Sequence, residues 1–164
     1  MITGNKIYLS IETNGLDLDK FEIIEVAVLK IDKLSNKHLF HRLIKPLTPL
    51  SSSVEQVTGL SNAVLNQQKT FEQIKNEMIN FIDNQEIVLH NQSFVLAFLN
   101  KQLGNPITNN VVDLMKIFNT KFPNESATLD FITTKLNLKI DTGFTSSLNE
   151  VFLLPRIYET LNEI

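Results

Sequence analysis

The sequence contains no cysteine, which excludes disulfide bonds and thiolate metal sites. A chain without cysteine fits a reducing compartment, so we expect a cytoplasmic protein. No apolar run approaches the roughly 20 residues that cross a bilayer, and we expect no membrane span. The segment Met1 to Lys6 also lacks the apolar centre of a signal peptide.

Clustered positive charge is absent as well. The formal net charge is -3, and the sequence has no basic run and no arginine cluster. Proteins that bind nucleic acid usually carry such a basic surface, because contacts to phosphates supply most of their non-specific affinity. The composition therefore argues against tight non-specific binding of nucleic acid, although a locally basic groove stays open.

The chain has 164 residues, which is enough to bury a core without covalent cross-links. It shows no internal repeat, no low-complexity segment and no linker that would divide it. We therefore expect one domain over residues 1–164.

The first 45 residues carry three apolar segments separated by short polar turns. These segments cover residues 6–11, 21–31 and 38–45, and the last is followed by Pro46. Successive strands with short turns predict an antiparallel meander.

Helical and strand patterns alternate after the meander. Thr70 followed by Gln73 is a capping-box pattern, and apolar residues then recur at helical spacing to about residue 83. Gly104 is a typical helix stop. This alternation predicts an α/β domain with a mixed sheet. The expected elements are a helical turn at 53–59, another that Ser61 can cap, a helix at 70–83, a strand at 86–90, a helix at 91–103, a strand end or helix start at 111–113, and helices that run to about 121, from 126 or 128 to 136, and from about 147 towards 162.

The first strand ends in a carboxylate. Glu12 is followed by Thr13-Asn14-Gly15, which are turn residues. The carboxyl ends of strands are where open α/β sheets bind ligands. Glu12 is therefore a candidate site residue, and the alternative is an acidic residue in a solvated turn.

Several segments, in this order along the chain, resemble the motifs of the DnaQ-like (DEDDh) 3′–5′ exonuclease family. The family includes the proofreading epsilon subunit of bacterial DNA polymerase III. The resemblance implies an RNase H-like fold with a mixed five-stranded sheet flanked by helices. The matching segments are YLSIETNGL at 8–16, EIIEVA at 22–27, VTGL at 57–60, VLHNQSF at 88–94, and the stretch from Val112-Asp113 to Lys121-Phe122-Pro123.

The resemblance implies a two-metal cleavage of phosphodiester bonds. Members of the family hold two Mg²⁺ ions with four carboxylates and use a histidine as general base. In this chain Ser10 takes the place of the first aspartate, and Glu12 keeps the glutamate. Val95 takes the place of the second-motif aspartate. Thr145 and Glu150 take the places of the histidine and the last aspartate.

These substitutions predict a degenerate active site. A serine hydroxyl is a weaker Mg²⁺ ligand than a carboxylate, and a valine offers no ligand atom. Threonine cannot accept a proton from water near pH 7, and a positioned base contributes roughly 10²–10⁴ in rate. Glu12 and Glu150 are then the only catalytic remnants. Glu12 is the remaining candidate metal ligand, and we expect no metal or other cofactor unless the chain is active with Mg²⁺ or Mn²⁺.

Capping gives Glu150 a second interpretation. Ser147 and Glu150 form a capping-box pattern at the start of the last helix, in which backbone N–H groups would satisfy the glutamate. Asp113 matches a structural position of the family at a helix start, where a capping carboxylate is favoured.

The resemblance also implies nucleic-acid contacts. The family's motifs place Thr13, Asn14, Gly15, His90 and Asn91 beside the substrate. His90 follows an apolar strand and begins a helix, so packing or capping is an alternative role for it.

The sequence thus favours an inactive homologue of a 3′–5′ exonuclease that acts as a binding subunit. Its partner would be a protein, including a second subunit in a homo- or heterodimer, or the 3′ end of single-stranded DNA or RNA. Protein binding is favoured because the chain is acidic. Two alternatives stay open: a divergent, active Mg²⁺- or Mn²⁺-dependent exonuclease of the epsilon type, and a structural subunit without a nucleic-acid role.

Overall fold

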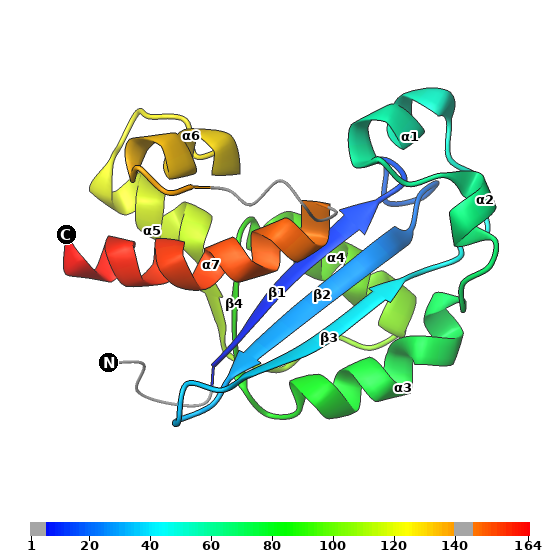
Figure 1. Cartoon of the computed structure of the whole chain (residues 1–164), viewed down its shortest axis with the longest axis horizontal. Helices are drawn as coiled ribbons and strands as arrows, with labels where there is room; N and C mark the ends of the chain where they lie inside the picture. Colours follow the sequence, from blue (N-terminus) through cyan, green and yellow to red (C-terminus); the bar gives the residue numbers. More distant parts are fainter. Residues whose placement is uncertain (1–5, 140–145) are drawn as a thin grey trace.

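A mixed sheet forms the centre of the molecule (Figure 1). The computed structural model describes residues 6–139 and 146–164. Within these residues the strand order is β3-β2-β1-β4-β5. The first three strands pair antiparallel, whereas β1 pairs parallel with β4 and β4 parallel with β5. The strands are β1 (Lys6–Thr13), β2 (Ile23–Ile31), β3 (Lys37–Leu43), β4 (Glu86–Leu89) and β5 (Val111–Asp113).

The predicted meander is confirmed, with small differences at its ends. β2 begins at Ile23 because the N–H of Phe21 donates to the carbonyl of Asp17 inside the preceding turn. β3 ends at Leu43, and the N–H of Lys45 already donates to the carbonyl of Lys69 rather than to β2. Both predicted strands are therefore shorter in the structure, because a hydrogen bond within the preceding turn involves Phe21 and a hydrogen bond to Lys69 involves Lys45.

The helices begin and end largely where local signals predict. Thr70 and Gln73 form the predicted capping box, in which the N–H of Thr70 donates to Oε1 of Gln73 at 3.0 Å. Gly104 ends its helix in the left-handed conformation with φ 73°. The helices are α1 (Ser52–Thr58), α2 (Asn62–Leu65), α3 (Phe71–Ile82), α4 (Gln92–Leu103), α5 (Leu114–Lys121), α6 (Leu129–Lys135) and α7 (Ser146–Glu163).

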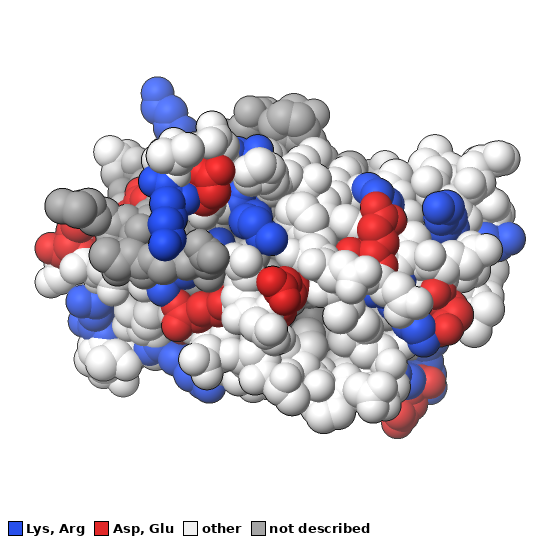
Figure 2. Space-filling view, turned by 90° about the horizontal axis from the view of Figure 1, so that it is seen from below, with Lys and Arg blue, Asp and Glu red and all other residues white. Residues whose placement is uncertain are grey.

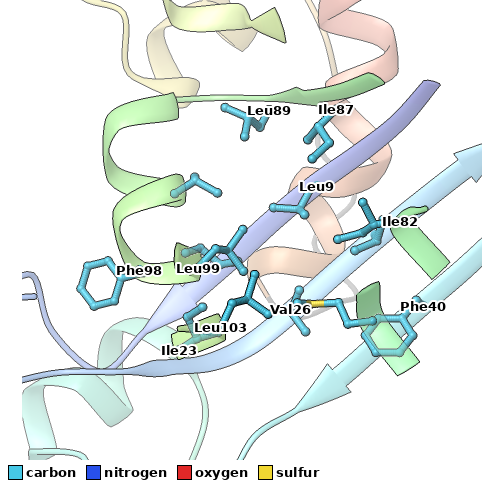
Figure 3. Close-up of a cluster of buried hydrophobic side chains, with 14 of the residues drawn as sticks. Leu9, Ile23, Val26, Phe40, Ile82, Ile87, Leu89, Phe98, Leu99 and Leu103 are labelled. Carbon is cyan, nitrogen blue, oxygen red and sulfur yellow. The ribbon is translucent and has the colours of Figure 1, made fainter. Parts of the chain in front are cut away.

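The helices lie on both faces of the sheet and bury a core on each. α3 and α4 pack on one face, and the side chains of that core are drawn in Figure 3. α5, α6 and α7 pack on the other face, which α7 crosses in Figure 1. Of the described helices, none is long and apolar enough to span a membrane. The arrangement is the expected mixed sheet flanked by helices.

Successive side chains of β1 point to opposite faces of the sheet, so each lies under the helices of one face. Leu9 lies in the core under α3 and α4, whereas Tyr8 lies in the core under α7. Ser10 and Glu12 are two and four residues after Tyr8, so they point to the same face of the sheet, which α7 covers, at the carboxyl end of the strand. The strand thus delivers both side chains to the place where α7 begins.

Candidate functional site

A cleft of about 510 Å³ opens at the carboxyl end of β1. Its walls come from β1 and the following turn, α1, and the first turns of α4 and α7. Ser10, Glu12 and Glu150 lie inside it together with apolar side chains. The lining residues are Leu9, Ser10, Ile11, Glu12, Thr13, Gly15, Leu16, Ser53, Val54, Val57, Thr58, His90, Asn91, Phe94, Val95, Leu129, Glu150 and Leu154.

A hydrogen bond between Ser10 and Glu150 crosses the cleft. The Ser10 hydroxyl donates to Oε2 of Glu150 at 2.5 Å, and the two residues are 140 positions apart in the chain. The Ser10 residue is only 4% exposed. The contact brings together two positions that the family resemblance assigned to its active site.

The capping-box interpretation of Glu150 is wrong. α7 begins at Ser146, one residue before the predicted start. The Ser147 hydroxyl is buried without a hydrogen-bond partner among the described residues. Glu150 instead points across the cleft to Ser10. The early helix start moves Ser147 into the helix, where its side chain no longer meets free N–H groups.

The cleft carboxylates are held in an unfavourable environment for charge. Burial, with Glu150 and Glu25 nearby, raises the pKa of Glu12 to about 8. Burial also raises the pKa of Glu150, and Glu25 and Asp130 add to this rise, while the hydrogen bond from Ser10 opposes it. Glu12 therefore keeps a proton over much of the neutral range.

A hydrogen-bonded pair beside the cleft, formed by Glu25 and His41, is a feature that the sequence analysis missed. Glu25 is fully buried on β2 and is the cross-strand partner of Glu12. Its Oε1 lies 2.7 Å from Nε2 of His41 on β3. A single acidic residue inside an apolar strand was the available signal, because a buried charge requires a partner. The pairing itself depends on the register between β2 and β3.

Val95 occupies the floor of the cleft with a hydrocarbon side chain. It lies in the first turn of α4, is buried, and packs in the core between α4 and the sheet. Thr145, the predicted replacement of the general base, lies outside the described residues.

The structure brings together four of the five residues expected beside nucleic acid. Thr13, Gly15, His90 and Asn91 all line the cleft. Asn14 is buried instead, and its side chain serves the fold. Its amide donates to the carbonyl of Thr48 at 2.8 Å and accepts from the N–H of Glu22 at 2.7 Å.

Gly15 has a packing role that explains its identity. A Cβ atom at this position would lie 2.2 Å from Cδ2 of Phe21. The glycine thus allows the turn after β1 to close against the Phe21 ring.

His90 and Asp113 both serve local structure. Nε2 of His90 donates to the carbonyl of Ala127 at 2.7 Å, and burial lowers the pKa of His90. The Asp113 carboxylate accepts from the backbone N–H groups of Asn91, Gln92 and Met115 at 3.0–3.1 Å. The predicted capping role of Asp113 is confirmed, and it joins the starts of α4 and α5.

The donor set fits a two-metal centre poorly. Mg²⁺ prefers oxygen ligands, and a two-metal site needs several carboxylates around the ions. The cleft offers Glu12, Glu150 and a Ser10 hydroxyl that already donates to Glu150. Within the described parts of the chain, no group of three or more His, Cys, Asp or Glu side chains could hold a metal ion.

Comparison with known proteins identifies the family. The family model described as "Exonuclease" (RNase_T) matches residues 9–143. The DNA polymerase III subunit epsilon of Buchnera aphidicola subsp. Schizaphis graminum is 27% identical over 171 residues, covering 95% of this chain and 73% of that protein. The PolC-type DNA polymerase III of Thermotoga petrophila is 30% identical over 136 residues, covering 80% of this chain and 10% of that protein.

Solved structures show the same fold. The nuclease domain of 3′hExo, a DEDDh family member bound to rAMP, superimposes with a TM-score of 0.83 at 18% identity and covers 98% of this chain and 92% of that one. Exonuclease X in complex with 5′ overhanging duplex DNA superimposes with a TM-score of 0.73 at 17% identity and covers 96% of this chain and 92% of that one. The predicted RNase H-like exonuclease fold is confirmed, and the chain belongs to the RNase_T exonuclease family.

Proposed function

We propose that this chain is a catalytically degenerate DnaQ-like exonuclease homologue that acts as a binding subunit. We also propose that residues 1–164 form a single domain. The observation that carries the proposal is the buried side chain of Val95. The first turn of α4 presents a buried hydrocarbon to the cleft where the family resemblance expects a metal-binding aspartate. No rotation of this side chain supplies a ligand.

Ser10 supports the same conclusion independently. Its hydroxyl is neutral and already donates to Glu150. Two carboxylates, Glu12 and Glu150, stand where the family uses four. Transition-state charge in phosphodiester cleavage needs the metal ions as clamps, and these donors are too few to hold two of them.

A protein partner suits the cleft better than a nucleic-acid end. The lining residues include two glutamates and, in the described part of the chain, neither lysine nor arginine. A phosphate needs positive charge or a metal ion nearby. Figure 2 shows the molecule from below the view of Figure 1. On this face the blue Lys and Arg atoms are scattered among white and red ones and form no continuous basic surface.

The rim of the cleft carries exposed apolar side chains that suit a protein partner. Leu16 is 82% exposed and Val57 is 84% exposed, and both line the cleft. The relatives named DNA polymerase III subunit epsilon are, by that name, parts of an assembly. A partner that belongs to a DNA replication complex is therefore our leading hypothesis.

A nuclease assay tests the loss of catalysis. The purified chain is incubated with 5′-labelled single-stranded DNA or RNA and Mg²⁺ or Mn²⁺. We expect no shortening of either strand above the level of a Glu12→Ala control. Metal-dependent shortening that disappears in the Glu12→Ala variant would contradict the proposal.

That contradictory result would favour a divergent, active 3′–5′ exonuclease. The observation on its side is that Glu12 and Glu150 line the same cleft. One or two carboxylates together with substrate phosphates can hold a Mg²⁺ ion. In that case activity would require Mg²⁺ or Mn²⁺ and would fall in a Glu150→Gln variant as well.

A capture experiment with matched variants tests the binding role. Proteins retained from a lysate of the native host are compared for the wild type, Leu16→Asp and Leu34→Asp. Leu34 is 83% exposed and lies in the turn between β2 and β3, away from the cleft. A partner of the cleft is retained by the wild type and Leu34→Asp and lost with Leu16→Asp. Equal retention by all three would contradict a role for the cleft.

A shift assay with labelled single-stranded DNA and RNA at low salt separates the remaining outcome. We expect weak binding at most. If the chain bound a 3′ end tightly and Leu16→Asp abolished that binding, the proposed partner would be a nucleic acid and not a protein.

A further inference from the structure

The cleft has two walls that are far apart in the chain and must be held together. β1 supplies one wall, and the first turns of α7 supply the other. Apolar contacts anchor α7 on the sheet through Val151 and Leu154, which are both buried. Inside the cleft, the hydrogen bond from Ser10 to Glu150 joins β1 to α7.

The Ser10 hydroxyl and the Glu150 carboxylate satisfy each other without a cation. The hydroxyl of Ser10 donates its proton to Oε2 of Glu150. This bond uses a lone pair of the carboxylate, and it holds the two side chains together across the cleft.

The two substitutions relative to the family also complement each other in length. The serine side chain holds its oxygen one bond closer to the backbone than aspartate does, and glutamate is longer than aspartate by one methylene. A short donor on β1 and a long acceptor on α7 therefore meet directly. An aspartate at both positions would need a cation or a retained proton between them, because two carboxylates repel each other at short range.

We propose that the Ser10–Glu150 hydrogen bond replaces divalent cations as the link between β1 and α7, so that the cleft is assembled without metal. The inference rests on the proposed loss of catalysis but not on the identity of the partner. It adds a property that the loss of catalysis alone does not require. The wall of the cleft is fixed before any ligand arrives, and binding to the cleft is insensitive to chelators.

Thermal unfolding of the full chain tests the inference, with the metal ion alone as the probe. Each protein is unfolded in EDTA and in millimolar Mn²⁺. We expect the same midpoint for the wild type in both solutions. Ser10→Ala should unfold roughly 3–10 °C lower in both solutions, because a buried hydrogen bond is lost and its acceptor is left without this partner.

A size-matched pair of variants that differ in charge makes the test specific. Ser10→Asp places a second carboxylate against Glu150, and Ser10→Asn has nearly the same size without the charge. We expect Ser10→Asp to be destabilised in EDTA and to regain roughly 5–10 °C in saturating Mn²⁺, because a bound ion stabilises only the folded state. Ser10→Asn should be destabilised equally in both solutions.

Three results would overturn the inference. The first is a wild-type midpoint that rises by several degrees in Mn²⁺. The second is a Ser10→Ala variant as stable as the wild type, and the third is a Ser10→Asp variant whose midpoint ignores Mn²⁺. None of these depends on nuclease activity or on a captured partner, so failure here is distinguishable from failure of the proposed function.

Discussion

The acidic residues at the ends of β5 and β1 lie in opposite environments, one surrounded by hydrogen-bond donors and the other by carboxylates. Asp113 at the end of β5 accepts from three backbone N–H groups and holds two helix starts together. Glu12 at the end of β1 is pressed against Glu150 and Glu25, and its pKa is raised to about 8. The Asp113 carboxylate is satisfied by backbone donors, whereas burial and neighbouring carboxylates disfavour the charged form of Glu12. The β5 end thus stabilises the fold, whereas the β1 end keeps an open cleft at a cost in stability.

The largest expected effect is the loss of the β5 cap. Asp113→Ala removes the acceptor of three backbone N–H groups at the starts of α4 and α5. We expect the free energy of unfolding to fall by about 2–4 kcal/mol, since a cap and a charged acceptor are lost together. Urea unfolding at neutral pH measures this change. Asp113→Asn, which keeps one acceptor oxygen, is the matched control and should lose less. Equal stability of Asp113→Ala and the wild type would remove the contrast between the two strand ends.

The next effect concerns the charge next to Glu12. His41→Ala leaves the fully buried Glu25 without the imidazole 2.7 Å from its carboxylate. We expect a loss of about 1–3 kcal/mol, less than for a fully buried pair because His41 is partly exposed. His38→Ala is the control, because His38 pairs with the exposed Asp32 at 3.3 Å. If both variants lost the same stability, the burial of Glu25 would not matter.

The smallest effect has the opposite sign. The pKa of Glu12 is about 8 in the folded chain, against an ordinary value of 4.5. A raised carboxyl pKa gives stability that is full below about pH 4.5 and is lost as the pH rises towards 8. Glu12→Gln removes this loss, so we expect a gain of roughly 1–2 kcal/mol at pH 8 and little change at pH 4.5. Thermal unfolding over this pH range checks the prediction, and a variant less stable than the wild type at pH 8 would contradict it.

Local patterns were enough to predict the elements of the fold. Apolar periodicity placed the strands and helices within a few residues, and the capping box at Thr70 and the stop at Gly104 are both present. These signals act over a few neighbouring residues, so one sequence contains them. The family motifs added the fold, a mixed five-stranded sheet flanked by helices, whereas the order of the strands came from the structure.

The site was predictable in position but not in its contacts. Ser10, Glu12 and Val95 line one cleft, as their motifs predict. The partner of Glu150 lies 140 residues away, so a nearby capping pattern gave the wrong interpretation. The burial of Asn14 escaped prediction because it depends on how the turn after β1 packs against a distant loop.

Titration of the wild-type chain with Mn²⁺ in a calorimeter tests the central claim most directly. The account predicts no saturable heat at millimolar Mn²⁺, since the first-strand hydroxyl donates to the last helix's glutamate and Val95 offers no ligand. Saturable binding of two ions per chain that Glu12→Gln abolishes would contradict it.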